Sequence, residues 1–187
     1  ASETCNTLDD NCDGLVDNGL PTTTYFLDAD GDTFGGATSI QSCFDPNSPP
    51  VCLYTFNLTD TYGDGWNGNQ MQLTTNGGAT VEATIGTTFT DGTAITETVL
   101  MTNGVTYDLT WTTIGSFTGE VGFDVLSSVG DIIYSLPSGS GGLAGTFLTS
   151  LSVTCPALGV YVTNNTDCDD ADATANPNGT EVCDNTI

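Results

Sequence analysis

The chain has 187 residues, of which 24 are acidic and none is lysine, arginine or histidine, so its formal net charge is −24. Such a charge repels phosphate backbones and anionic lipids, which excludes nucleic-acid binding. Because the usual general bases and nucleophile activators are missing, we expect that the protein is not an enzyme. A glycosidase that works with two carboxylates is the catalytic alternative that this composition leaves open.

No apolar run is long enough to cross a bilayer, and no basic region precedes an apolar leader, so we expect no membrane insertion and a mature chain. Neighbouring carboxylates repel one another, and this chain has no basic side chain to offset them. The compensating cations must therefore come from outside. Calcium is favoured over zinc or copper because the available ligands are hard oxygens and imidazole is absent.

Residues 1–43 are expected to form a loop-rich segment that is organised by calcium. The first acidic stretch fits the consensus D-x-N-x-D-G-x-x-D, in which alternate side chains point at one ion and a glycine permits the sharp turn. Its expected ligands are Asp9, Asn11, Asp13, Asp17 and the carbonyl of Leu15, with Gly14 at the turn. A short strand over residues 25–27 leads into a second stretch, whose expected ligands are Asp28, Asp30, Asp32 and the carbonyl of Phe34.

Residues 44–154 have a different composition and are expected to form a domain that splits the acidic segments. Alternating apolar and polar residues predict strands over residues 53–59, 70–75, 80–85, 95–101, 105–112, 120–126, 131–135 and 146–154. Turns rich in glycine, asparagine and aspartate separate these strands. The predicted fold class is therefore all-β: an antiparallel β-sandwich, jelly-roll-like, flanked by loop-rich calcium-binding segments.

One loop of the predicted sandwich, residues 60–68, holds more polar groups than a turn requires. It resembles the D-x-Y-G-D-G-W-N-G signature of secreted β-sandwich modules. We expect a further calcium site there, with ligands Asp60, Asp64 and Asn67 and with Glu120 closing the cage from a facing strand. The alternative is a glycine-rich turn without an ion. In either case Trp66 should cap the core, and Trp111 should lie in the core rather than form a platform for sugars.

Residues 155–187 are expected to form a third segment. Its acidic cluster supplies four further candidate calcium ligands, Asp167, Asp169, Asp170 and Asp172.

The chain has seven cysteines and no C-x-x-C pair, which favours disulfides in an oxidising, extracellular compartment over a zinc site. Two pairing schemes are open. The first joins Cys5 to Cys12, Cys43 to Cys52 and Cys155 to Cys168, and leaves Cys183 for a junction between copies; the second joins Cys43 to Cys155 and Cys168 to Cys183. Sequons of the N-x-S/T type predict glycosylation at Asn57, Asn164 and Asn178.

Two parts of the chain resemble the MopE-type metal-binding repeats of secreted bacterial proteins. The similarity lies in residues 3–5, 9–17 and 25–32, and resumes in residues 155–156, 159–162, 165–170, 176–177 and 181–183. The resemblance implies a secreted, repeat-bearing surface protein whose loops bind divalent metals.

The two ends of the chain also resemble each other, because residues 180–183 (Thr-Glu-Val-Cys) echo residues 2–5 (Ser-Glu-Thr-Cys). A unit with matching ends is expected to contact copies of itself head to tail, and such contacts build open fibres when the rotation between copies does not close. We therefore expect a calcium-stabilised extracellular structural protein, the repeating protomer of a surface filament or stalk. The alternative is a glycan-binding adhesin module of a secreted surface protein.

Overall fold

The computed structural model describes residues 2–140 and 144–179, which divide into two units. The first unit takes its residues from Ala1–Pro50 and Pro156–Ile187, and the second is Val51–Cys155. Regular structure is almost entirely antiparallel β, apart from the single 3-10 turn η1 (Asn76–Gly78). Within these described ranges, no helix is long and apolar enough to cross a membrane.

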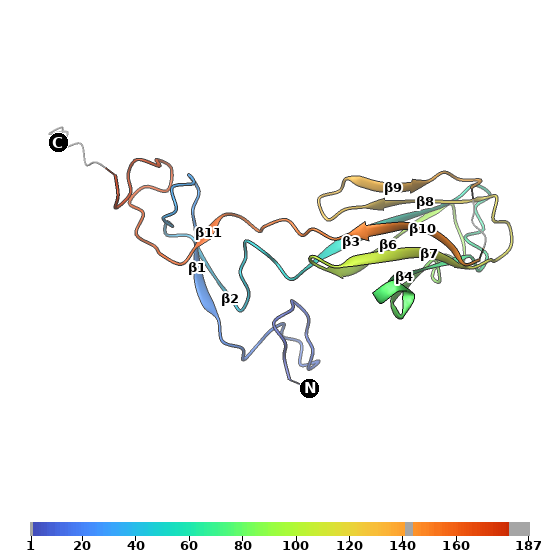
Figure 1. Ribbon diagram of the computed structural model, residues 1–187, viewed down its shortest axis with the longest axis horizontal. Helices are drawn as coiled ribbons and strands as arrows, with labels where there is room; N and C mark the ends of the chain where they lie inside the picture. The colour runs from blue at the N-terminus through green and yellow to red at the C-terminus, as the bar shows by residue number, and fades with distance from the viewer. Residues whose placement is uncertain (1, 141–143, 180–187) are drawn as a thin grey trace. The chain divides into compact units, whose positions relative to one another are not determined.

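The first unit contains a small antiparallel sheet with the order β11-β1-β2 (Figure 1). Its strands are β1 (Thr23–Leu27), β2 (Ser39–Ser42) and β11 (Tyr161–Val162). The strand expected over residues 25–27 is therefore confirmed, as the last three residues of β1. Since β11 comes from the far end of the sequence and pairs with β1, the two acidic segments belong to one unit.

The second unit is a sandwich of two four-stranded antiparallel sheets, and all eight strands expected from the sequence are present. One sheet has the order β10-β7-β4-β5 and the other β6-β3-β8-β9. The strands are β3 (Val51–Asp60), β4 (Gln70–Thr75), β5 (Thr80–Ile85), β6 (Ala94–Thr102), β7 (Thr106–Thr113), β8 (Val121–Leu126), β9 (Ile132–Leu136) and β10 (Thr146–Ser152).

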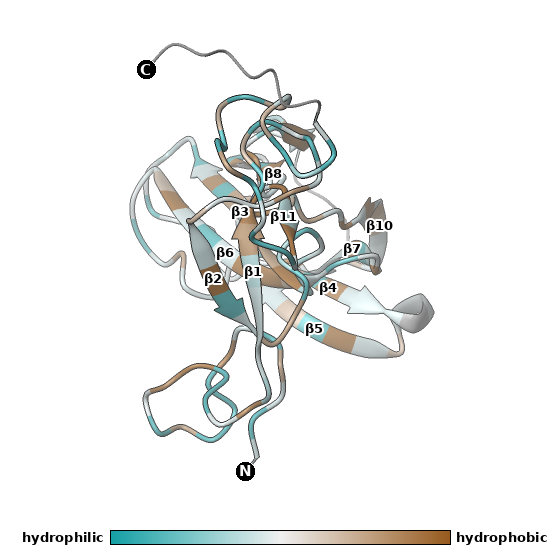
Figure 2. Ribbon diagram, turned by 90° about the vertical axis from the view of Figure 1, so that its left-hand side faces the viewer, coloured by the Kyte–Doolittle hydropathy of each residue, from teal (hydrophilic) through white to brown (hydrophobic). Residues whose placement is uncertain are grey.

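The core of the sandwich forms because apolar side chains alternate along its central strands. In β3, Tyr54, Phe56 and Leu58 are buried, while the residues between them are only partly buried. Figure 2 shows this alternation as brown and pale bands along the ribbon. Trp66 and Trp111 are both fully buried, with ring centroids 5.6 Å apart. The expected core positions of both tryptophans are confirmed.

The disulfides differ from both schemes expected from the sequence. Cys5 bonds to Cys43 within the first unit, and Cys52 bonds to Cys155 within the second. The pairs Cys5–Cys12, Cys43–Cys52, Cys155–Cys168 and Cys43–Cys155 are therefore wrong. The reason is topological: Cys52 lies in β3 and Cys155 follows β10, so that this bond closes the sandwich at the two ends of its own chain segment. Cys12 and Cys168 are exposed free thiols, and Cys183 lies outside the described residues.

Candidate metal centres

The first two acidic stretches fold into loops with the same hydrogen bonds. In each, the first acidic side chain accepts bonds from the amides of the fifth and sixth residues. The third side chain accepts a bond from the fifth amide, and the fifth accepts one from the seventh. Residues 9–15 and 28–34 are therefore two copies of one loop, in which the carboxyl or amide groups of alternate residues turn inward and accept bonds from the loop's own amides.

The two loops also share an unusual backbone. Their fourth residues, Cys12 and Gly31, have φ of 62° and 83°, and their sixth residues, Gly14 and Thr33, have φ of 89° and 78°. The left-handed region is unfavourable for non-glycine residues, so Cys12 and Thr33 adopt it only because the loop geometry demands it. The sequence signals only the glycines at two of these positions.

The second loop gathers its acidic groups into a cluster. One ligand atom from each of Asp28, Asp30 and Asp32 lies within 4.8 Å of the others. Asp28 is buried and its two oxygens accept bonds from the loop amides, whereas buried oxygens of Asp30 and Asp32 have no partner among the described residues. Desolvation, followed by the charge of Asp32, raises the pKa of Asp30. A buried carboxylate oxygen without a donor is costly unless a cation occupies its remaining lone pairs.

The C-terminal segment closes over this second loop. Asn164 accepts a bond from Gly35 N and donates one to the carbonyl of Thr33. Asp170 accepts a bond from Ala29 N at 2.9 Å, and in Figure 1 the orange C-terminal segment runs beside the loop that follows β1. Asp167, whose amide bonds to Gly35 O, has a buried oxygen that is also unpartnered in the described chain, and its charge contributes to the raised pKa of Asp30.

The structure therefore divides the third acidic cluster. Asp167 and Asp170 face the second loop. The sequence had predicted that these two residues belong to a site of their own. Asp169 and Asp172 are exposed and accept bonds from nearby backbone amides in their own segment. Gly36 explains the close approach, since an added Cβ there would lie 2.5 Å from the carboxylate of Asp170.

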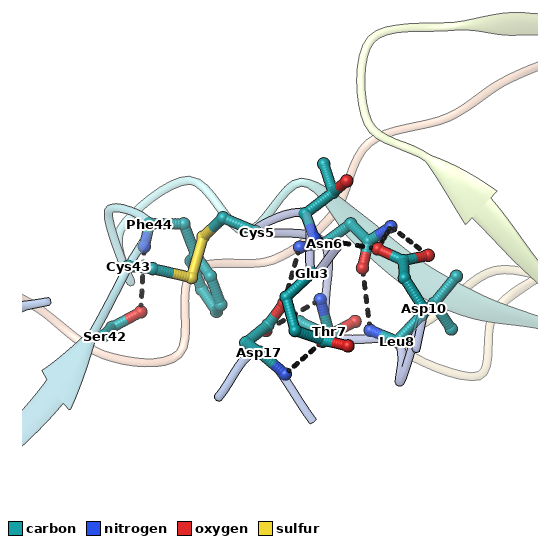
Figure 3. The surroundings of a disulfide bond; sticks show 11 residues. Glu3, Cys5, Asn6, Thr7, Leu8, Asp10, Asp17, Ser42, Cys43 and Phe44 are labelled. Atoms are coloured by element: carbon teal, nitrogen blue, oxygen red, sulfur yellow. Dashed lines mark hydrogen bonds between the residues drawn. A yellow bond between two sulfur atoms is a disulfide. The ribbon is translucent and has the colours of Figure 1, made fainter. Parts of the chain in front are cut away.

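The first loop is closed differently, because Asp17 does not point into it. The carboxylate of Asp17 accepts bonds from the amides of Asn6 and Thr7, next to the Cys5–Cys43 disulfide (Figure 3). Glu3 in turn accepts bonds from the amides of Asn11 and Asp17. Bonds from Asn18 and from the Leu15 amide lower the pKa of Asp13. Asp9, Asn11 and Asp13 keep the calcium-loop arrangement, but no further acidic group joins them in the part of the chain described here.

The sandwich carries a second carboxylate cluster, formed by Asp60, Asp64 and Glu120, whose ligand atoms also lie within 4.8 Å of one another. The register explains the meeting: Asp60 ends β3 and pairs with Val121 of β8, which brings the preceding Glu120 alongside. Asp60 is 3% exposed. One oxygen of Asp60 accepts bonds from the amides of Gly63 and Asp64, and its other oxygen has no partner in residues 2–140 and 144–179. Asn67 lies beside this cluster as a donor to Asp64.

Glu120 shows the electrostatic cost of this arrangement. Its pKa is raised, first by desolvation and then by the charges of Asp60 and Asp64. One of its oxygens is buried and lacks a partner among the described atoms. Three carboxylates that repel one another in this way form a ready site for a divalent cation, which would convert the repulsion into attraction.

Trp66 fixes the loop that carries Asp60 and Asp64. Its ring lies in the core, its indole nitrogen donates to Thr59 O at 2.9 Å, and its amide donates to Phe89 O. Gly65 is required here, because its φ is 79° and an added Cβ would lie 2.6 Å from the amide nitrogen of Asp91. The loop that carries Asp60 and Asp64 is thus anchored to the core through Trp66.

The three sequon asparagines have different surroundings. Asn57 lies on β3 and accepts a bond from Thr96. Asn164 uses its amide nitrogen to hold Thr33, so a glycan on that nitrogen would compete with the closure of the second loop. Asn178 is exposed. Glycosylation at each stays a prediction.

Comparison with known protein families supports the predicted resemblance of the two ends of the chain to MopE-type repeats. Residues 1–18 and 167–187 match the family described as "Putative metal-binding motif", Cu-binding MopE. The match includes the first loop and Asp167, and it does not extend to residues 60–68, for which the signature resemblance stays a prediction. No curated protein and no solved structure matches the chain. Residues 1–18 and 167–187 of this chain are therefore similar to the motif of this family.

Proposed function

We propose that this chain is a calcium-stabilised extracellular structural protein, the repeating protomer of a surface filament or stalk. The observation that carries the proposal is the group of buried, unpartnered carboxylate oxygens on Asp30, Asp32 and Asp167 in the described chain. With no basic side chain anywhere in the sequence, only an external cation can offset these charges. Cations with this role in an acidic, disulfide-bonded chain are typical of extracellular proteins.

The donor set favours calcium over copper. In the two described clusters, every candidate ligand atom without a hydrogen-bond partner is a carboxylate oxygen, and the chain has no histidine. Hard oxygen ligands suit calcium, whereas copper prefers imidazole, thiolate or thioether groups. Asp28, Asp30, Asp32 and Asp167 would hold one ion, and Asp60, Asp64 and Glu120 would hold a second. Asp9, Asn11 and Asp13 would contribute to a third.

The position of the first of these ions supports the proposal of a structural role. Asp28 and Asp167 come from opposite ends of the sequence, and few apolar groups hold this unit together. An ion shared between them would tie both ends of the chain into one folded unit. The predicted head-to-tail contact involves residues 180–187, which lie outside the described residues, and the first loop of the next copy.

Assembly should then depend on calcium more steeply than on total ionic strength, because screening alone cannot neutralise units of charge −24. Negative-stain electron microscopy can compare the purified chain in millimolar calcium, in chelator, and in sodium chloride of equal ionic strength. We expect fibres only with calcium. A chain truncated after residue 179 should still bind calcium and should stay monomeric. Fibres from this truncated chain, or a monomeric full chain at high concentration in calcium, would contradict the filament role.

A further inference from the structure

A pocket opens beside the sandwich cluster and is lined by Tyr62, Asp64, Phe117 and Glu120. Its volume is about 410 Å³, within the usual range for small-ligand sites. Two of its walls are the acidic groups of the proposed calcium site. The other two are aromatic rings that packing does not explain, since Tyr62 is 77% exposed and Phe117 is 62% exposed.

The cluster would leave a bound calcium incompletely coordinated. Calcium takes six to eight oxygen ligands, and three carboxylates supply only part of that number. Asp60 is more than nine-tenths buried and has one oxygen without a partner in the described chain. Asp64 and Glu120, by contrast, also line the pocket. The remaining coordination positions of the ion would therefore face the pocket and solvent.

The charge of the site selects the kind of oxygen that can fill those positions. Three carboxylates and one calcium leave a net charge of −1, in a chain that is already strongly negative. An anionic ligand would be repelled, whereas neutral hydroxyl groups would not. The rings of Tyr62 and Phe117 add apolar surface that suits the C–H face of a sugar.

The backbone holds one of these rings at the pocket. Phe117 has a φ of 56°, which is rare for a bulky residue, and its carbonyl accepts a bond from the Glu120 amide. Residues in this sparsely populated region cluster at active sites and ligand clamps. The same tight turn places Phe117 and Glu120 on the pocket together.

We propose that this pocket binds a neutral saccharide, two adjacent hydroxyl groups of which complete the coordination of calcium while its C–H face packs on Tyr62 and Phe117. The proposal rests on calcium binding at Asp60, Asp64 and Glu120, as proposed above, and adds a ligand that the structural role does not require. It assigns a place and a chemistry to glycan binding.

Saturation-transfer difference NMR on the full chain tests this, with mannose, galactose, glucose and fucose as probes. We expect at least one of them to bind in 10 mM calcium and to lose all binding in chelator. The substitutions Tyr62→Ala and Phe117→Ala should each weaken binding of that sugar at least tenfold, while calcium affinity, measured by calorimetry, changes less than twofold. Phe147→Ala is the matched control, because Phe147 is an exposed ring elsewhere on the sandwich, and it should change neither.

The outcomes distinguish the saccharide site from the calcium site of the sandwich on which it rests. If calcium binds and none of the four sugars nor any neutral glycan on an array binds with it, the saccharide site is wrong and the calcium site stands. If calcium does not bind to Asp60, Asp64 and Glu120, the saccharide site and the calcium site of the sandwich both fail, whereas the site at Asp28, Asp30 and Asp32, which carries the proposed function, is unaffected. Tighter binding of glucuronic acid than of glucose would overturn the assignment of a neutral ligand.

Discussion

Replacing Asp60 by asparagine should abolish the effect of calcium on the stability of the sandwich while preserving its fold. Extracellular calcium sites have dissociation constants of roughly 10⁻⁴ to 10⁻³ M, so 10 mM calcium exceeds them about 10- to 100-fold. Binding to the folded state alone then adds about 1.4 to 2.7 kcal/mol. For a domain of about 100 residues, whose unfolding entropy is about 0.21 kcal/mol/K, Tm should rise by about 7 to 13 °C in the unmodified protein.

The substitution should act in the opposite direction without calcium. Asparagine keeps an oxygen for the amides of Gly63 and Asp64, and it removes one of three mutually repelling charges within 4.8 Å. In chelator, the Asp60→Asn variant should therefore be at least as stable as the unmodified protein. In calcium it should be less stable, because the gain from binding is lost.

Tryptophan fluorescence reports this transition selectively, since both tryptophans of the chain, Trp66 and Trp111, lie in the sandwich core. The matched control is Asp131→Asn, which makes the same charge change at an exposed position of the same unit and should keep the full calcium shift. A calcium shift in Asp60→Asn equal to that of the control would refute the assignment of Asp60 as a ligand. A large loss of stability in chelator would refute the argument from repulsion.

Three further predictions concern the other site, the disulfides and pH. Asp167→Asn should weaken calcium binding by the first unit about tenfold and should raise hydrogen exchange at residues 28–35, measured by mass spectrometry. Unchanged exchange would contradict the assignment of Asp167 to the site at the second loop. Removing the disulfide Cys52–Cys155, which spans 103 residues, should lower the free energy of unfolding of the sandwich by up to about 4.7 kcal/mol, measured by urea unfolding. Peptide mapping that finds Cys43 bonded to Cys155 would contradict the structure. The pKa values of Asp30 and Glu120 are raised in the folded chain. At pH values just above the ordinary pKa of these groups, the folded chain without calcium therefore binds more protons than the unfolded chain. In chelator its stability should fall as pH rises through that window, and calcium binding should release protons, seen as a buffer-dependent heat in calorimetry; the same heat in all buffers would exclude this coupling.

Local patterns in the sequence determined most of the secondary structure. All eight sandwich strands were predicted because each alternates apolar and polar residues between clear turn signals, and such alternation depends only on which face is buried. The two acidic loops were also predictable, since acidic or amide side chains at alternate positions mark such a loop in the sequence itself. Two strands were missed. β2 and β11 have four and two residues, too few to show a period, and they exist because β1 offers them a partner.

Only the tertiary structure decided which distant groups meet. Asp167 joins the second loop because β11 pairs with β1 and returns the C-terminal segment to it, a contact across more than a hundred residues that no local pattern encodes. Asp17 fits the consensus, but its carboxylate accepts bonds from the amides of Asn6 and Thr7 and does not close the loop. The cysteine pairs followed the same rule. Spacing along the chain suggested other pairs, whereas the fold brought Cys5 to Cys43 within the first unit and joined the two ends of the second unit through Cys52 and Cys155. A disulfide forms only where backbone geometry places two cysteines within reach.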